Sequence, residues 1–128
     1  MAVGSQSRKR LLLVDDEEIV RILLGEYLTG LDLEIMEADS GKSALEKMEE
    51  QGHPDAIVSD IMMPDMDGLT FLSKTRNDPN MASIPFMVIT ADDQPETREK
   101  AMALGADDFV LKPLAQDDFV DMVKRFVA

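Results

Sequence analysis

Hydrophobic residues follow two alternating patterns along this chain. Five short runs are mostly continuous in apolar residues and end at a polar residue, which is typical of strands buried on both faces of a sheet. These runs predict strands at residues 10–14, 33–38, 56–60, 84–90 and 109–112. The second run alternates apolar residues with acids, and this pattern favours a strand near the edge of the sheet.

Each predicted strand is followed by a predicted helix, and the clearest of these helices have apolar residues at helical spacing. The first helix carries apolar residues at this spacing, namely Ile19, Ile22, Leu23, Tyr27 and Leu28. Ser40 caps the second helix and Gly52 ends it, and three further helices are expected at residues 68–76, 95–104 and 115–127. Strands that alternate with helices predict a doubly wound α/β fold, in which helices cover both faces of a five-stranded parallel sheet and the crossovers are right-handed.

Composition limits the possible functions. The chain has 128 residues, which favours one domain, and no cysteine, which excludes disulfides and thiolate metal sites. Its formal net charge of −13 argues against direct binding to nucleic acid or to an anionic membrane, and it favours cations and basic partner surfaces. No apolar run approaches the roughly 18 residues of a membrane span, and residues 1–10 lack the apolar core of a signal peptide. We therefore expect a soluble cytoplasmic protein.

Polar side chains stand where four of the apolar runs end. Asp15 and Asp16 follow the first run, Asp60 ends the third, Thr90 ends the fourth and Lys112 ends the fifth. The carboxyl ends of parallel strands meet at one edge of the sheet, where doubly wound folds bind their ligands. We therefore expect these five side chains to gather at that edge.

Each of these residues also has an ordinary structural interpretation. Asp60 can cap a loop, and the acidic residues 15–18 can cap a helix and interact favourably with its dipole. Thr90 can cap the following turn, and Lys112 can be a solvated lysine. The combination favours a site, because each residue stands at the carboxyl end of its own strand.

The gathered residues have the chemistry of phosphoryl transfer. Carboxylates held together require a counter-charge, and Mg²⁺ suits a site with few carboxylates and several waters. Lys112 adds a positive charge and Thr90 adds a hydroxyl, and such parts recur around transferring phosphoryl groups. Asp60 is then the expected nucleophile.

The chain resembles the receiver domains of two-component response regulators. The resemblance rests on residues 13–17 (LVDDE), 59–68 (SDIMMPDMDG), 89–91 (ITA) and 105–113 (GADDFVLKP). It implies a flavodoxin-like α/β fold with five helices and a five-stranded sheet in the order 2-1-3-4-5. It covers residues 9–128 and leaves residues 1–8 as a flexible N-terminal segment.

The resemblance also implies a set of roles at the strand ends. Asp60 accepts a phosphoryl group from the phosphohistidine of a sensor histidine kinase or a phosphotransfer protein. Asp16 and Asp60 bind Mg²⁺ together with the backbone carbonyl of Met62, while Asp15 acts largely through water. Such a domain is a phosphoacceptor in signalling, not an enzyme that acts on other substrates, because it catalyses only its own phosphorylation and dephosphorylation.

Further residues are implied to pass the signal on. Lys112 contacts the phosphoryl group, Thr90 bonds to it, and Phe109 stands where the family has an aromatic switch. Phenylalanine has no hydroxyl, so a switch at Phe109 works by burial alone. The signalling surface is the fourth helix, fifth strand and fifth helix, and it acts on a downstream protein or output domain. The peptide between Lys112 and Pro113 is often cis in this family.

Two residues are expected to modulate the lifetime of phospho-Asp60. Met62 stands two residues after the acceptor, and Asp92 stands two residues after Thr90, so both border the approach of an attacking water. Met62 is long and apolar and shields the phosphoryl group, whereas Asp92 is able to orient a water. We expect the shielding by Met62 to dominate.

Three other classes of protein fit the sequence less well. A haloacid-dehalogenase-type phosphatase needs a second Asp two positions after its nucleophile, where Met62 stands. A flavodoxin cradles a phosphate in a Ser/Thr-rich loop after the first strand, and the acidic residues 15–18 repel a phosphate there. An interaction module that works without phosphorylation has no need of the five site residues, all of which are present.

Overall fold

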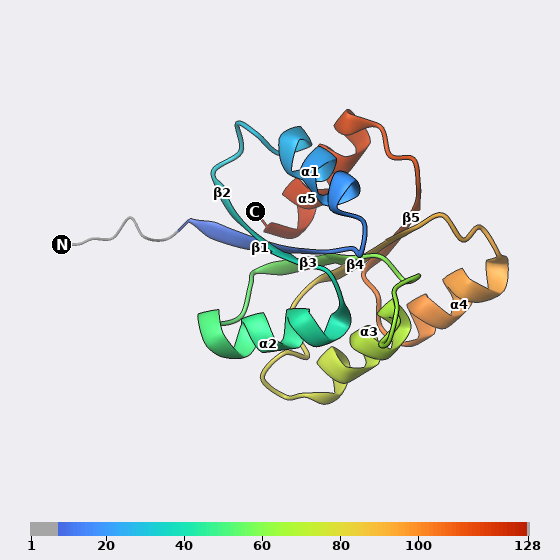
Figure 1. The fold of residues 1–128 in the computed structure, drawn as a ribbon. Helices are drawn as coiled ribbons and strands as arrows, with labels where there is room; N and C mark the ends of the chain where they lie inside the picture. Colours follow the sequence, from blue (N-terminus) through green and yellow to red (C-terminus); the bar gives the residue numbers. More distant parts are fainter. Residues whose placement is uncertain (1–7, 128) are drawn as a thin grey trace.

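Five parallel strands alternate with five helices in the computed structural model, which describes residues 8–127. The strand order is β2-β1-β3-β4-β5, as the resemblance implied (Figure 1). The elements are β1 (Lys9–Val14), α1 (Glu18–Tyr27), β2 (Leu33–Ala38), α2 (Gly41–Gln51), β3 (Ala56–Ser59), α3 (Gly68–Asn77), β4 (Phe86–Thr90), α4 (Pro95–Ala103), β5 (Asp108–Leu111) and α5 (Gln116–Val127).

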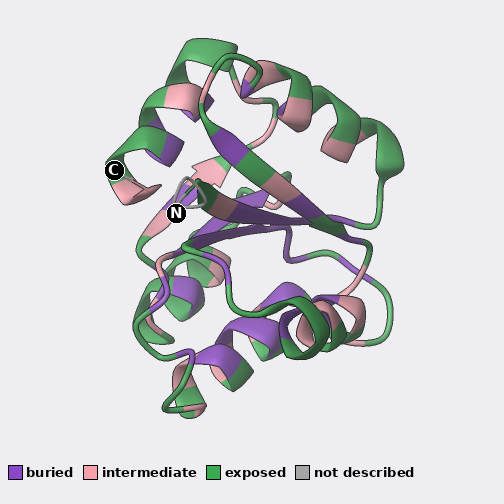
Figure 2. Ribbon diagram, turned by 90° about the vertical axis from the view of Figure 1, so that its left-hand side faces the viewer, coloured by how far each residue is buried: buried purple, intermediate pink, exposed green. Residues whose placement is uncertain are grey.

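The helices form two layers, one on each face of the sheet (Figure 1). Helices α1 and α5 pack on one face, where Leu24 and Phe119 belong to the same core cluster as Leu11 and Leu13 of β1. Helices α2, α3 and α4 cover the other face, where the second cluster contains Phe71. The buried residues follow the sheet and the inward sides of the helices (Figure 2).

Strand burial follows the hydrophobic pattern. All residues of β3 and β4 are buried, as continuous apolar runs predict for central parallel strands. In β2, Leu33, Met36 and Ala38 are buried whereas Glu34 and Glu37 are exposed, and β2 lies at an edge of the sheet. The alternating second run was therefore interpreted correctly.

Some boundaries and one helix face differ from the prediction. Strand β4 begins at Phe86 and not at residue 84, because the N–H of Ile84 bonds to Met81 O in a turn and Pro85 has no N–H to donate. Helix α1 leaves part of its apolar pattern in solvent, since Ile19 is 80% exposed and Ile22 is 51% exposed. The apolar face of α1 is thus wider than the part of the helix that packs on the sheet.

The predicted caps of α2 are both present. The side-chain oxygen of Ser40 accepts a hydrogen bond from the backbone N–H of Ser43 at 3.0 Å. Gly52 follows the helix with φ +89°, a left-handed conformation in which a residue without Cβ is favoured. These local signals were sufficient to place both ends of the helix.

The predicted flexible segment 1–8 lies outside the described residues except for Arg8. Arg8 donates a hydrogen bond to Leu33 O at 2.7 Å, so this side chain contacts the edge strand. Within residues 8–127, no helix is both long enough and apolar enough to cross a membrane.

Candidate functional site

Strand register brings Asp15 and Asp60 side by side. Val14 of β1 pairs with Ser59 of β3, and the backbone N–H of Asp60 donates to Val14 O at 2.9 Å. Both aspartates are the first residues after their strands, so both side chains leave the sheet at its carboxyl edge. Both residues are also buried, because helices and loops surround this edge.

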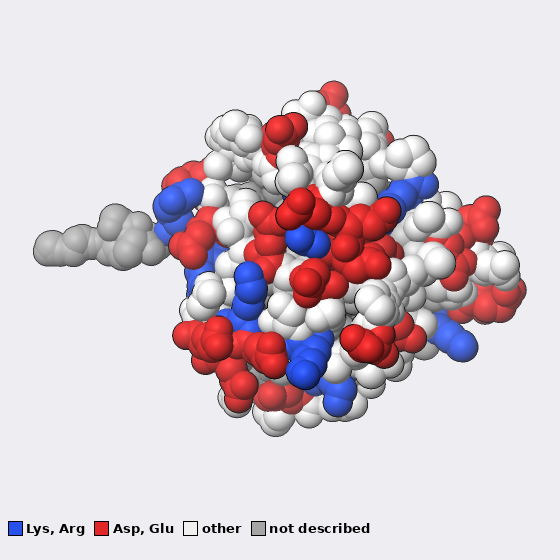
Figure 3. Space-filling view, in the orientation of Figure 1, with Lys and Arg blue, Asp and Glu red and all other residues white. Residues whose placement is uncertain are grey.

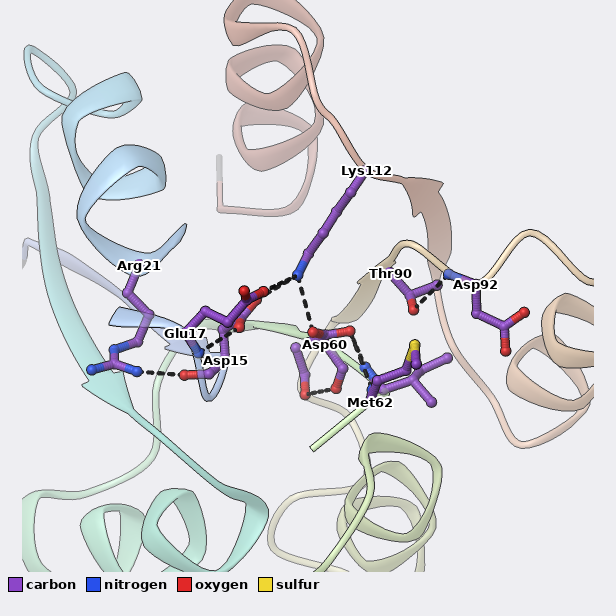
Figure 4. Close-up of polar contacts among 10 residues, drawn as sticks. Asp15, Glu17, Arg21, Asp60, Met62, Thr90, Asp92 and Lys112 are labelled. Carbon is purple, nitrogen blue, oxygen red and sulfur yellow. Dashed lines mark hydrogen bonds and ion pairs between the residues drawn. The ribbon is translucent and has the colours of Figure 1, made fainter. Parts of the chain in front are cut away.

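The last two strands deliver Thr90 and Lys112 to the same edge. Thr90 pairs with Leu111 across β4 and β5, and the backbone N–H of Lys112 donates to Thr90 O at 2.8 Å. The peptide bond between Lys112 and Pro113 is cis. The Lys112 side chain points back across the strand ends toward the aspartates (Figure 4).

Lys112 links the two buried carboxylates. Its Nζ lies 2.8 Å from Asp15 Oδ2 and 3.0 Å from Asp60 Oδ2, and its side chain is only 16% exposed. Glu17 Oε1 lies farther away, at 3.9 Å. The counter-charge that clustered carboxylates require is therefore already provided in part by this lysine.

These contacts shift two pKa values. Burial raises the pKa of the Asp15 carboxyl above 3.8, although the hydrogen bond from Lys112 opposes the shift. Burial alone would lower the pKa of Lys112, but its hydrogen bonds to Asp15 and Asp60 outweigh burial, and the pKa rises above 10.5. Lys112 therefore remains charged at neutral pH.

Three aspartates form a candidate metal centre. Asp15, Asp16 and Asp60 each offer a carboxylate oxygen, and these oxygens lie within 4.8 Å of one another. Asp16 is exposed whereas the other two residues are buried, so the cluster opens to solvent on the Asp16 side. Carboxylate oxygens with room for waters are the ligands that suit Mg²⁺, and this donor set therefore fits that ion.

The loop after β3 holds the Asp60 carboxylate. Its Oδ1 accepts hydrogen bonds from the backbone N–H groups of Ile61 at 2.7 Å and Met62 at 3.2 Å. The loop then returns so closely that a Cβ on Gly68 would lie 2.1 Å from Asp60 O. Only glycine fits there, and Asp67 caps α3 by accepting from Thr70 N at 2.8 Å.

The acidic side chains dominate this part of the surface. Figure 3 shows them gathered at the centre of the face in view, around a small group of basic atoms. The site contains two buried aspartates, the exposed Asp16 and the nearby Glu17, opposed by Lys112. An anionic substrate therefore needs additional positive charge to approach the Asp60 carboxylate.

Sequence reasoning missed Arg21 of α1. Its Nη1 donates to the backbone carbonyl of Asp15 at 2.5 Å, and its Nε lies 3.0 Å from Glu37 Oε1. Arg21 therefore links the backbone of Asp15 to the Glu37 side chain of β2. The only signal in the sequence was a single basic residue within α1, and that signal does not identify a partner 16 residues away.

Thr90 and Asp92 are placed differently from Asp60. The Thr90 residue is fully buried, and its Oγ1 accepts from the backbone N–H of Asp92 at 3.2 Å. The Asp92 carboxylate points away from Asp60 (Figure 4), and it accepts hydrogen bonds from Gln94 N and Thr97 Oγ1. These bonds lower the pKa of Asp92.

Phe109 is buried in this structure, with 6% of the residue exposed. The Arg98 guanidinium carbon lies 5.7 Å from the centre of its ring, and Arg98 Nη1 donates to Phe109 O at 3.4 Å. Sequence reasoning did not identify Arg98. A switch that works by burial of Phe109 therefore requires a second rotamer in which the ring leaves this position.

Comparison with known proteins identifies the family. A family model of the response regulator receiver domain matches residues 11–124. The two-component response regulator ORR11 of Oryza sativa subsp. indica is 28% identical over 125 residues, which cover 98% of this chain and 85% of the relative. A crystal structure of a Chloroflexus aurantiacus protein assigned to the response regulators has a TM-score of 0.88 at 30% identity, covering 94% of this chain and 98% of that chain.

A third relative is longer. The alkaline phosphatase synthesis transcriptional regulatory protein PhoP of Bacillus subtilis is 34% identical over 119 residues, which cover 93% of this chain and 48% of that protein. The chain thus spans about half the length of this relative. With the family model matching most of its length, the chain belongs to the receiver domains of two-component response regulators, which are signalling domains.

Proposed function

We propose that Asp60 is the phosphoacceptor of this receiver domain, and that the donor is the phosphohistidine of a sensor histidine kinase or a phosphotransfer protein. The observation that carries the proposal is the contact of Lys112 Nζ with both Asp60 and Asp15, at 3.0 and 2.8 Å. The fixed ammonium group places a positive charge beside the Asp60 carboxylate, where it can attract the oxygens of an incoming phosphoryl group.

The reaction joins an Asp60 oxygen to phosphorus while the bond between phosphorus and the donor imidazole nitrogen breaks. The imidazole leaves with the electron pair of that bond, and Lys112 stabilises the charge on the phosphoryl oxygens. Asp15, Asp16, Asp60 and the Met62 carbonyl would hold Mg²⁺, which supplies further positive charge when bound. The domain catalyses only its own phosphorylation and dephosphorylation.

The signal passes from the site to the surface of α4, β5 and α5. Thr90 bonds to the phosphoryl group and shifts, and Phe109 changes its rotamer in response. That surface then acts on a downstream protein or an output domain. The net charge of −13 supports protein partners with basic surfaces in the cytoplasm, and not direct contact with nucleic acid or membrane.

Replacement of the acceptor tests this proposal. Asp60→Asn substitutes a poorly nucleophilic amide, so labelling by acetyl phosphate or a phosphohistidine donor in the presence of Mg²⁺ should be abolished, while the circular dichroism spectrum is unchanged. Wild-type protein without Mg²⁺ is the control for metal dependence. Label of undiminished intensity on the variant would place the acceptor elsewhere and refute the assignment.

Replacement of Met62 tests the control of lifetime. In hydrolysis, water oxygen attacks phosphorus, the bond to Asp60 breaks, and the protons of water remain with the released phosphate. Met62 is 60% exposed beside the acceptor, whereas hydrogen bonds from Gln94 N and the Thr97 hydroxyl hold the Asp92 carboxylate away from Asp60 (Figure 4), which supports Met62 as the stronger influence. We expect label to decay faster in Met62→Asn, whose amide can orient a water; equal or slower decay would contradict the shielding.

A further inference from the structure

Three hydrogen bonds of Asp92 join the site to the start of α4. The backbone N–H of Asp92 donates to Thr90 Oγ1 at 3.2 Å. Asp92 Oδ1 then accepts from Gln94 N at 3.0 Å, and Asp92 Oδ2 accepts from the Thr97 hydroxyl at 2.8 Å. In the proposed function the last two bonds bear only on the lifetime of phospho-Asp60, and they have no role in passing the signal to α4.

Helix α4 has few other attachments at this end. Within Pro95–Ala103 the buried residue is Ala101, which lies in the second half of the helix. The N-cap residue Gln94 forms no side-chain cap. Asp92 does not supply the missing cap, since its carboxylate accepts from the N–H of Gln94 and from the hydroxyl of Thr97. It instead attaches the first turn of the helix through the Thr97 side chain.

Thr90 is able to hold Asp92 and a phosphoryl group at the same time. A hydroxyl has one proton to donate and two lone pairs that accept. The Thr90 hydroxyl accepts from the Asp92 N–H with one lone pair. Its proton remains available for a bond to an oxygen of the phosphoryl group on Asp60. A displacement of Thr90 toward the acceptor consequently pulls on Asp92 without breaking the bond between them.

We infer that Asp92 and Thr97 are positioning residues that couple Thr90 to the first turn of helix α4. This inference rests on the proposed phosphorylation of Asp60. Phosphorylation moves Thr90, Asp92 follows through its N–H, and the carboxylate of Asp92 carries the movement to Thr97. The same bonds keep the Asp92 carboxylate directed at the helix and away from the path of an attacking water.

The test is Thr97→Val, which removes the hydroxyl and preserves the β-branched shape. Amide chemical shifts are recorded with Mg²⁺ present, before and after addition of beryllofluoride. Beryllofluoride is a phosphoryl analogue that binds carboxylates. Thr97→Ser restores the hydroxyl and serves as the rescue variant. Thr70→Val is the matched control, because Thr70 is likewise the third residue of its helix, and within residues 8–127 its hydroxyl makes no hydrogen bond.

In the wild type we expect beryllofluoride to shift the amides of Ile61 and Met62 and those of α4. In Thr97→Val the amides of Ile61 and Met62 should respond fully. The equilibrium between the two positions of α4 should shift about fivefold less on binding of the analogue, which is the typical effect of losing one hydrogen bond. Thr97→Ser and Thr70→Val should respond as the wild type does. A purely structural role for Thr97 would shift α4 in the absence of the analogue and leave the response to it intact.

The two proposals fail in different ways. If Ile61 and Met62 do not respond in the wild type, the phosphoacceptor assignment to Asp60 fails. If they respond and α4 of Thr97→Val also responds as in the wild type, the coupling through Asp92 and Thr97 is refuted.

Discussion

Helices α4 and α5 stand on either side of β5 in the sequence, yet they are attached to the sheet by different means. Helix α5 buries Phe119, Met122 and Val123 against one face of the sheet. Helix α4 buries Ala101 within Pro95–Ala103, and it is attached further by the hydrogen bonds of Asp92 and by Arg98 over Phe109.

The difference predicts that α4 responds to changes at the site more strongly than α5 does. Burial of apolar side chains is non-directional and does not depend on charge at the strand ends. Hydrogen bonds and cation–π contacts depend on direction and distance, so a small displacement near Thr90 or Phe109 changes them. A charge added at Asp60 should therefore affect α4 more than α5, although both helices belong to the proposed signalling surface.

The largest effect is expected where α5 is anchored. Phe119→Ala removes a fully buried ring that packs 6.3 Å from the ring of Tyr27, and it should lower the free energy of unfolding by about 3–5 kcal/mol. Met102→Ala on α4, where the residue is 40% exposed, should cost about 0.5 kcal/mol or less. Urea denaturation measures both, and equal costs would remove the distinction between the helices.

A smaller effect is expected for the arginines that cover aromatic rings. Arg98→Met removes the contact with Phe109 and should cost about 0.5–1 kcal/mol. Arg125→Met on α5 is the matched variant, since Arg125 lies 5.9 Å from the Phe126 ring and bonds to Asp108. Both variants should have similar stability, but only Arg98→Met should shift the ring resonances of Phe109; unchanged Phe109 resonances would show that Arg98 does not hold the ring.

The smallest effect is expected from acid. Hydrogen bonds from Gln94 and Thr97 lower the pKa of Asp92 below 3.8, so their stabilisation of α4 is fully present above pH 3.8 and is lost as the pH falls through the lower, folded pKa. Hydrogen exchange of the α4 amides, compared between wild type and Asp92→Ala, should therefore differ above pH 3.8 and converge below it. The α5 amides should be equal in both proteins throughout, and a difference that persists in acid would argue against the carboxylate.

Local sequence was sufficient for the order of elements and for the identity of the strand ends. The continuous run that forms β3 and the alternating run that forms β2 differ visibly, because burial on two faces and on one face impose different patterns. Ser40 and Gly52 mark the ends of α2 because capping involves only neighbouring residues. Asp60 and Lys112 were found for the same reason, since each interrupts an apolar run.

Only the tertiary structure decided the individual contacts among these groups. That Lys112 bridges Asp15 and Asp60, 97 and 52 residues away, depends on the register of strands distant in sequence. The exposure of Ile19 depends on how much of α1 the sheet covers, and the burial of Phe109 of β5 under Arg98 depends on where α4 packs. The periodicity of hydrophobic residues describes the helix or strand that contains them. These contacts arise between different elements, so the packing of the whole chain determines them.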